Sequence, residues 1–382
     1  MKGRINTIIL LLPLLLIFGV IQSEAAVFIQ CPCIADPENP PAADPATGNI
    51  ECLPINGINA ACKQLTAGDG FITMADGAEI YIFGFHDVTG VAQSMIMDDG
   101  MLAQEFSAPT IKVKEGQDFY LSLTNVGMVI RPDLFDPHSV HWHGFPNAAS
   151  VFDGEPMASA TVNMGATFTY YYKAVLPGTY MYHCHVEAPE HMQMGMLGNL
   201  YMESATPNCA YNGAPETCFD VEYPIEIVAF DPRFHEADET IQPLPFAAMD
   251  DTYPMLNGRG YPDTVNPADI ITKNKHSQRV PALITATQGQ RILLRIASLS
   301  TTSFHSLTVL GIPMRVVAKD ARALNFPYTT NSVFLGGGES ADVILDTLNV
   351  PKGTYFLYVT NMEHLNNNAE EYGGMMTEII LN

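Results

Sequence analysis

The sequence is short of basic residues. It holds 18 lysines and arginines against 41 aspartates and glutamates, so its formal net charge is −23 at pH 7. Binding to nucleic acid depends on clustered positive charge, so no nucleic-acid partner is expected. A field of negative sign favours cations instead, either metal ions or a basic redox protein, and it also keeps an exported protein soluble.

Long hydrophobic runs are absent after the N-terminus. Residues 1–4 are positively charged, residues 8–20 form an apolar run, and residues 23–25 fit a small-x-small cleavage site. This order predicts a secretory signal peptide over residues 1–25 and a secreted or periplasmic protein, with a retained membrane anchor as the alternative. No later segment is apolar enough to span a bilayer, so no stable membrane span is expected after removal of the signal.

The seven cysteines include no Cys-x-x-Cys-His run, which excludes covalent attachment of haem. With Cys184 set aside for a role described below, six remain, and an even number in an exported protein predicts disulfides. Cys209 and Cys218 flank a short loop and are predicted to pair with each other between two domains. Four more cysteines predict a disulfide-tied extension over residues 26–70, with a metal site as the alternative and with the connectivity left open: Cys31, Cys33, Cys52 and Cys62.

A sustained helical period is also missing. Short β-branched and aromatic runs alternate with Gly and Pro, which predicts an all-β Greek-key fold. The chain contains an internal repeat, because residues 111–125 match residues 284–298 as a strand, a Gly turn and a second alternating strand. Two tandem β-sandwich domains are therefore predicted, over residues 71–205 and 219–382.

The most informative segment is Tyr182–Met196, with the sequence YHCHVEAPEHMQMGM. A type 1 (blue) copper site binds its ion through a thiolate and two imidazoles, with a weak axial thioether. Cys184, His191 and Met196 supply three of these ligands. The fourth is expected from the upstream segment HSVHWHG, in which His138 stands apart from a His-x-His pair. A disulfide cysteine among surface histidines is the alternative.

Alternation along a strand separates the remaining histidines from Cys184. If the segment is extended, His183 and His185 project to one face and Cys184 projects to the other. His141 and His143 form a second outward pair by the same rule. These four histidines are therefore predicted to hold a second copper site, back to back with the first.

The two segments resemble the multicopper oxidases, in the branch with two cupredoxin domains that is related in architecture to the copper nitrite reductases. The resemblance implies two tandem cupredoxin-like domains, copper as cofactor, and an oxidoreductase that reduces dioxygen with electrons from a small molecule, a metal ion or a redox protein. The spacing of six residues between Cys184 and His191 departs from the usual four, so a longer loop is expected there. The resemblance also implies two ligand sets: His138, Cys184, His191 and Met196 for type 1 copper, and His141, His143, His183 and His185 for half of a type 2/type 3 cluster.

The second copy has lost these motifs. His183-Cys184-His185 corresponds to Tyr358-Val359-Thr360, so the second copy is not expected to hold a blue copper. It keeps only His305 and His364 in suitable segments, either as possible interfacial ligands or as ordinary structural histidines. The segment of His364 resembles the region in which copper nitrite reductases donate a histidine across a trimer interface. That likeness implies a homotrimer, with an interfacial site shared between subunits.

Two other functions stay open. A copper nitrite reductase-like enzyme is the first, although His141 stands where those enzymes have a catalytic aspartate. A non-enzymatic blue copper electron-transfer protein is the second.

Overall fold

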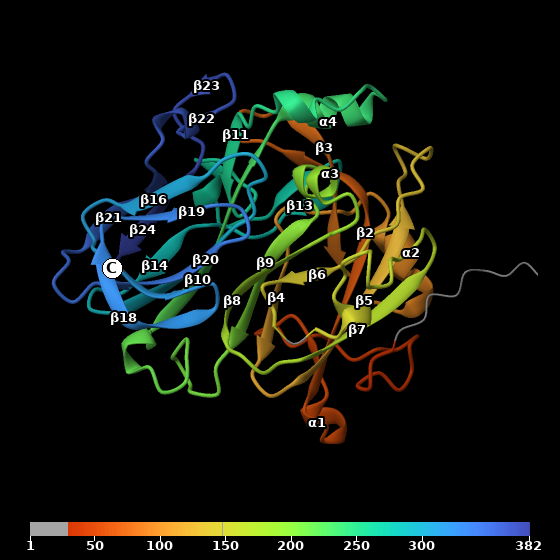
Figure 1. Cartoon of the computed structure of the whole chain (residues 1–382), viewed down its shortest axis with the longest axis horizontal. Helices are drawn as coiled ribbons and strands as arrows, with labels where there is room; N and C mark the ends of the chain where they lie inside the picture. The colour runs from red at the N-terminus through yellow and green to blue at the C-terminus, as the bar shows by residue number, and fades with distance from the viewer. Residues whose placement is uncertain (1–29, 147) are drawn as a thin grey trace, which may run out of the picture.

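The computed structural model describes residues 30–146 and 148–382, and the predicted signal peptide lies outside them. Strands dominate, and they form two β-sandwiches that lie side by side (Figure 1). The all-β prediction with two tandem cupredoxin-like sandwiches is confirmed. Among the described residues, no helix is long and apolar enough to cross a membrane.

The first sandwich consists of two sheets. One sheet has the order β1-β2-β5-β7, with β3 paired to β2, and the other has the order β4-β9-β8-β6. The strand β2 includes residues on both sides of the predicted boundary at residue 70, and it pairs in parallel with β5. The bounds of these strands are β1 Ile50–Glu51, β2 Ala60–Thr73, β3 Glu79–Asp87, β4 Ala108–Lys114, β5 Asp118–Gly127, β6 His141–His143, β7 Thr167–Lys173, β8 Gly178–His183 and β9 Leu197–Glu203.

The second sandwich repeats this plan. One sheet has the order β11-β10-β15-β20-β17-β18, and the other has the order β14-β24-β21-β16-β19. The run β14-β24-β21-β16 has the same pairing directions as β4-β9-β8-β6, parallel once and then antiparallel twice. The bounds are β10 Val221–Phe230, β11 Tyr253–Leu256, β14 Ile284–Ala286, β15 Arg291–Ser298, β16 His305–Val309, β17 Met314–Lys319, β18 Arg322–Thr330, β19 Ser332–Leu335, β20 Ser340–Asp346, β21 Gly353–Val359 and β24 Met376–Leu381.

Short elements connect the strands. Two small hairpins are formed by β12 Ile270–Thr272 with β13 Lys275–Gln278, and by β22 Asn366–Asn367 with β23 Glu370–Glu371. The α-helices are α1 Leu53–Asn56, α2 Ile96–Gly100, α3 Ala188–Gln193 and α4 Pro232–Glu239. The 3-10 turns are η1 Gln93–Met95, η2 Ser150–Phe152, η3 Pro215–Thr217, η4 Phe246–Ala248, η5 Asp263–Val265 and η6 Met362–His364.

Each sandwich has its own apolar core, and a third apolar cluster joins the two. In this third cluster, Phe106 of the first sandwich packs against Phe230 of β10, with ring centroids 4.5 Å apart. Met181 of β8 and Leu299, which follows β15, belong to the same cluster. Burial of apolar surface between the sandwiches therefore fixes β8 against the second domain.

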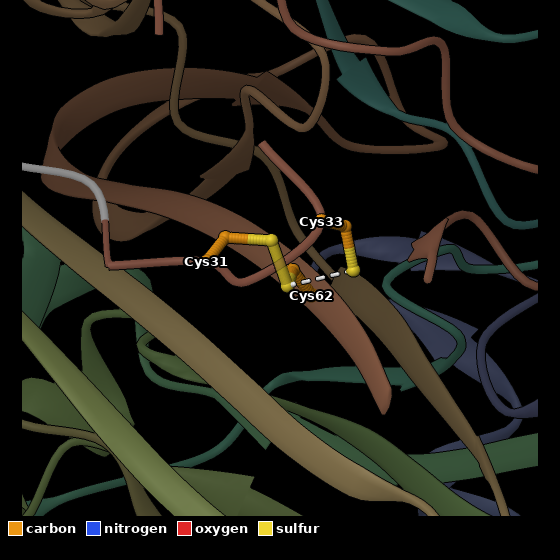
Figure 2. A group of neighbouring side chains, drawn as sticks. All are labelled: Cys31, Cys33 and Cys62. Atoms are coloured by element: carbon orange, nitrogen blue, oxygen red, sulfur yellow. Dashed lines mark hydrogen bonds between the residues drawn. A yellow bond between two sulfur atoms is a disulfide. The ribbon is translucent and has the colours of Figure 1, made fainter. Parts of the chain in front are cut away.

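The N-terminal extension is tied by disulfides, as predicted. Cys31 pairs with Cys62 of β2, and Cys33 pairs with Cys52. Figure 2 shows the Cys31–Cys62 bond and the sulfur of Cys33, which lies 3.5 Å from that of Cys62. All four sulfurs are used in disulfides, so the alternative of a metal site made of these cysteines is wrong. The predicted Cys209–Cys218 disulfide is also present, in the connection between β9 and β10.

Candidate metal centres

The first centre is a buried group around Cys184. Ligand atoms of His138, Cys184 and His191 all lie within 4.8 Å of one another. The Sγ atom of Cys184 is 3.3 Å from His191 Nδ1 and 4.0 Å from His138 Nδ1, and all three side chains have no exposed surface. Met196 is fully buried in the same core cluster. The structure thus brings together the residues predicted to hold type 1 copper.

Local geometry explains why these residues meet. Cys184 directly follows β8, and its N–H donates to the carbonyl of Met196 (3.0 Å), whose N–H donates to the carbonyl of His191 (2.8 Å). Helix α3 begins within the six-residue spacing between Cys184 and His191, where the sequence predicts a longer loop, and it carries His191. The N–H of Ser139 donates to Cys184 Sγ at 3.4 Å, so the backbone beside His138 also supports the sulfur.

The donor set of the first centre fits copper. The Nδ1 atoms of His138 and His191 face Cys184 Sγ, and their buried Nε2 atoms have no hydrogen-bond partner among the described residues. Burial lowers the pKa of His138 well below its usual value and that of His191 to about 4, so both rings are neutral and can act as ligands at neutral pH. Burial raises the pKa of the Cys184 thiol to about 11, so loading with metal must release a proton. One thiolate, two imidazoles and one thioether are the ligands of blue copper.

The second centre is a pocket lined by four histidines, two of which, His183 and His185, flank Cys184 in the chain. His141 and His143 of β6 lie beside His183 of β8, and β6 pairs with β8 so that His141 faces His183. The His185 ring lies 5.0 Å from that of His141, measured between centroids. The four rings line a pocket of about 350 Å³, closed on one side by second-domain residues: Leu299, Ser300, Thr301, Gly337 and Gly338.

Backbone carbonyls fix the orientation of two of these imidazoles. His141 Nδ1 lies 2.6 Å from the carbonyl oxygen of Asp153, and His183 Nδ1 lies 2.9 Å from that of Cys184. A carbonyl only accepts, so both Nδ1 atoms carry hydrogens and both Nε2 atoms are left as ligands. Burial lowers the pKa of His183 to about 3 and also lowers that of His143, which keeps these rings neutral.

Family models of multicopper oxidases match residues 88–207 and residues 247–380, one in each sandwich. The chain belongs to the multicopper oxidase family. Members of this family bind copper, in agreement with both donor sets.

Named relatives agree with this assignment. The L-ascorbate oxidase of Nicotiana tabacum is 26% identical over 272 residues, which is 67% of this chain and 44% of that protein. The multicopper oxidase MmcO of Mycobacterium tuberculosis is 27% identical over 258 residues, which is 62% of this chain and 45% of that protein. The chain thus spans less than half the length of these curated relatives.

Solved structures show the same fold. The blue copper oxidase from Nitrosomonas europaea has a TM-score of 0.66 and 25% identity, over 83% of this chain and 85% of that one. The copper nitrite reductase from Nitrosomonas europaea has a TM-score of 0.59 and 17% identity, over 84% and 93% of the two chains.

This member of the multicopper oxidase family also has a histidine pair in its second sandwich. His305 and His364 lie with ring centroids 5.0 Å apart, beside Asp251. Burial lowers the pKa of His305 to about 4. His305 has no exposed surface and His364 is 9% exposed. Both rings lie inside their own chain, and the possible interfacial roles of His305 and His364 stay predictions.

Some contributors to the centres were not predicted from sequence. The N–H of Ser139 contacts Cys184 Sγ, and the carbonyl of Asp153 contacts His141 Nδ1. Both contacts use backbone atoms, which a side-chain motif cannot predict. Met192 of α3 also lines the histidine pocket. The sequence gives no signal for the second-domain wall of this pocket, because those residues are apolar, small or hydroxyl-bearing.

Proposed function

We propose that the protein is an exported copper-dependent oxidoreductase that takes electrons at a type 1 copper and passes them to a second copper centre, where dioxygen is reduced. One observation carries this proposal. Cys184 belongs to the buried group, whereas its neighbours His183 and His185 belong to the histidine pocket. Copper, when bound, supplies one-electron oxidation and reduction at both places.

The chain itself provides the connection between the two centres. A single peptide bond joins Cys184 to each flanking histidine. The hydrogen bond from His183 Nδ1 to the Cys184 carbonyl adds a second link between the imidazole and the cysteine. The end of β8 and the two residues that follow it therefore supply ligands to both centres.

The ligand assignment follows from this arrangement. His138, Cys184, His191 and Met196 would hold type 1 copper. The second centre would use the imidazoles of His141, His143, His183 and His185, and the pocket beside them is large enough for a small acceptor molecule. An imidazole at position 141, where a nitrite reductase-like site would have a carboxylate, favours dioxygen over nitrite as the acceptor.

The electron donor is a small molecule, a metal ion or a redox protein, and the surroundings of His191 favour a cation. The carboxylate of Asp136 lies 3.9 Å from His191 Nε2, and Glu187 and Glu190 lie close to the same ring. The net charge of −23 acts in the same direction over a longer range.

Export is supported by the three disulfides, because such bonds persist outside the reducing cytosol. The homotrimer stays a proposal with weaker support, since His364 contacts His305 within its own chain. Native mass spectrometry of the copper-loaded protein would test it, and a monomer at full occupancy would rule out a site shared between subunits.

Replacing Cys184 with serine tests the proposed function. The loaded wild-type protein should be blue or green through thiolate-to-copper charge transfer, and Cys184→Ser should lose this colour and one copper while circular dichroism stays unchanged. A band that persists in the variant would refute the type 1 assignment. Metal analysis of His183→Asn/His185→Asn also separates the alternatives, because an oxidase should lose copper from the histidine pocket and an electron carrier should bind as much copper as wild type.

A further inference from the structure

The group Asp251, His305 and His364 has the composition of a metal site. Its three ligand atoms lie within 4.8 Å of one another, although the residues come from three separate segments of the chain. Within the part of the chain that the structure describes, neither ring nitrogen of His305 has a hydrogen-bond partner, and the buried Nδ1 of His364 also has none. Buried polar atoms are nearly always paired, so three unpaired nitrogens in one place indicate a missing partner.

Strand register shows where this group lies in the repeat. In the first sandwich, His141 pairs with His183. In the second, Thr308 pairs with Tyr358 at the equivalent strands β16 and β21. His138 lies three residues before His141, and His305 lies three residues before Thr308, so these two histidines occupy equivalent positions. Cys184 follows His183 directly, and Val359 follows Tyr358 directly, so Val359 stands at the position of the cysteine.

Backbone hydrogen bonds extend the equivalence to the other ligands. The N–H of Val359 donates to the carbonyl of Met375 (3.0 Å), and the N–H of Met375 donates to the carbonyl of His364 (3.0 Å). Cys184, Met196 and His191 make the same two bonds in the first sandwich, at 3.0 and 2.8 Å. His364 therefore corresponds to His191, and Met375 corresponds to Met196.

The two histidine pairs also share their geometry. The ring centroids of His138 and His191 are 5.0 Å apart at an interplanar angle of 55°, and those of His305 and His364 are 5.0 Å apart at 41°. Met375 is fully buried, like Met196. The second sandwich thus keeps three of the four type 1 positions, and only the thiolate is lost, to Val359.

We infer that Asp251, His305 and His364 bind a divalent cation, with copper(II) as the preferred occupant, at the type 1 position of the second domain. Two imidazoles and a carboxylate suit copper(II) and zinc(II), and copper(II) binds such donors more tightly. The Asp251 carboxylate supplies the negative charge that Val359 does not. It accepts a hydrogen bond from Thr302 (2.6 Å), which leaves it held beside the pair.

This site does not rest on the proposed function, because it uses no residue of the other two centres. Without a thiolate, its copper would have no charge-transfer colour. It would add a non-blue signal to the electron paramagnetic resonance spectrum instead.

Metal analysis of the full chain is the first test. After loading with a copper(II) salt and dialysis, His305→Ala should hold one copper fewer than wild type and lose the non-blue signal of this site, while its blue absorption stays unchanged. His276→Ala is the control, since His276 is half exposed and paired with Asp269 at 3.0 Å. Equal copper content in wild type and folded His305→Ala would overturn the inference.

A gain of colour is the second test, and it does not depend on the stability of His305→Ala. In a Cys184→Ser background, Val359→Cys restores the missing ligand at the second position. The blue band that is absent from Cys184→Ser should return in Cys184→Ser/Val359→Cys, and His305→Ala should remove it again. A folded, copper-treated double variant without the band would show that the second position binds no copper, which would also overturn the inference.

Discussion

Replacing Gly338 with alanine probes the histidine pocket from its second-domain wall. Gly338 has a positive φ of +87°, and a Cβ atom there would lie 2.9 Å from His143 Nε2 and 3.0 Å from Cε1. Ordinary van der Waals contact begins near 3.4 Å, so the ring of His143 must move by about half an ångström. Misplacement of a reacting group on this scale can reduce turnover roughly 10- to 100-fold.

Gly289 offers a matched control for the backbone cost. It has a similar φ of +95° in the turn before β15, and a Cβ atom at this position would have no atom of residues 30–146 or 148–382 within 4 Å beyond its chain neighbours. Alanine in a left-handed conformation costs about 1–2 kcal/mol, so both variants should lose about this much free energy of unfolding in chemical denaturation.

Oxygen consumption should then separate the two variants. Gly338→Ala should turn over roughly 10- to 100-fold more slowly than Gly289→Ala, and both should keep the blue absorption because neither position touches the Cys184 group. Equal turnover in the two variants would refute the placement of His143 in the working pocket.

Two further predictions concern stability. The buried carboxylate of Asp342 accepts hydrogen bonds from Thr179 of β8 and from Tyr211, while Arg295 keeps its closer partner Glu222 at 2.8 Å. Asp342→Ala leaves two buried hydroxyls without an acceptor, so it should cost about 1–3 kcal/mol in urea denaturation, and an unchanged stability would contradict this. Burial raises the pKa of Glu226 from 4.5 to about 8. Between these two pH values the folded state holds a proton that the unfolded state has released. The free energy of unfolding of the wild type should therefore fall as the pH rises from 4.5 to about 8. Glu226→Gln should reduce this pH dependence, and an unchanged slope would contradict the assigned pKa.

The ligands of the first two centres could be predicted from sequence because they lie in two short segments that resemble those of the multicopper oxidases. Alternation along an extended segment predicts that His183, the last residue of β8, and Cys184, the next residue, project to opposite sides. The internal repeat could be predicted because residues 111–125 and 284–298 both keep a turn glycine, Gly116 and Gly289. The predicted domain boundaries stay predictions, and β2 crosses one of them.

Contacts between distant segments that carry no recognisable motif could not be predicted. Asp251 joins His305 and His364 only because η6 and the chain before β11 pack against the start of β16. The same limit applied to the disulfides of the extension, since four cysteines allow three connectivities. Helix α3 was not predicted, because its six residues are too few to show a helical period.

The most direct test of the central claim is the double variant His183→Asn/His185→Asn. His183 and His185 belong to the histidine pocket and Cys184 to the buried group, so the variant should keep the blue absorption and accept one electron from a donor, yet lose steady-state reduction of dioxygen. Stopped-flow absorption and an oxygen electrode would measure both in one preparation. Turnover at the wild-type rate would contradict the account, and the four outward histidines would then have only a structural role.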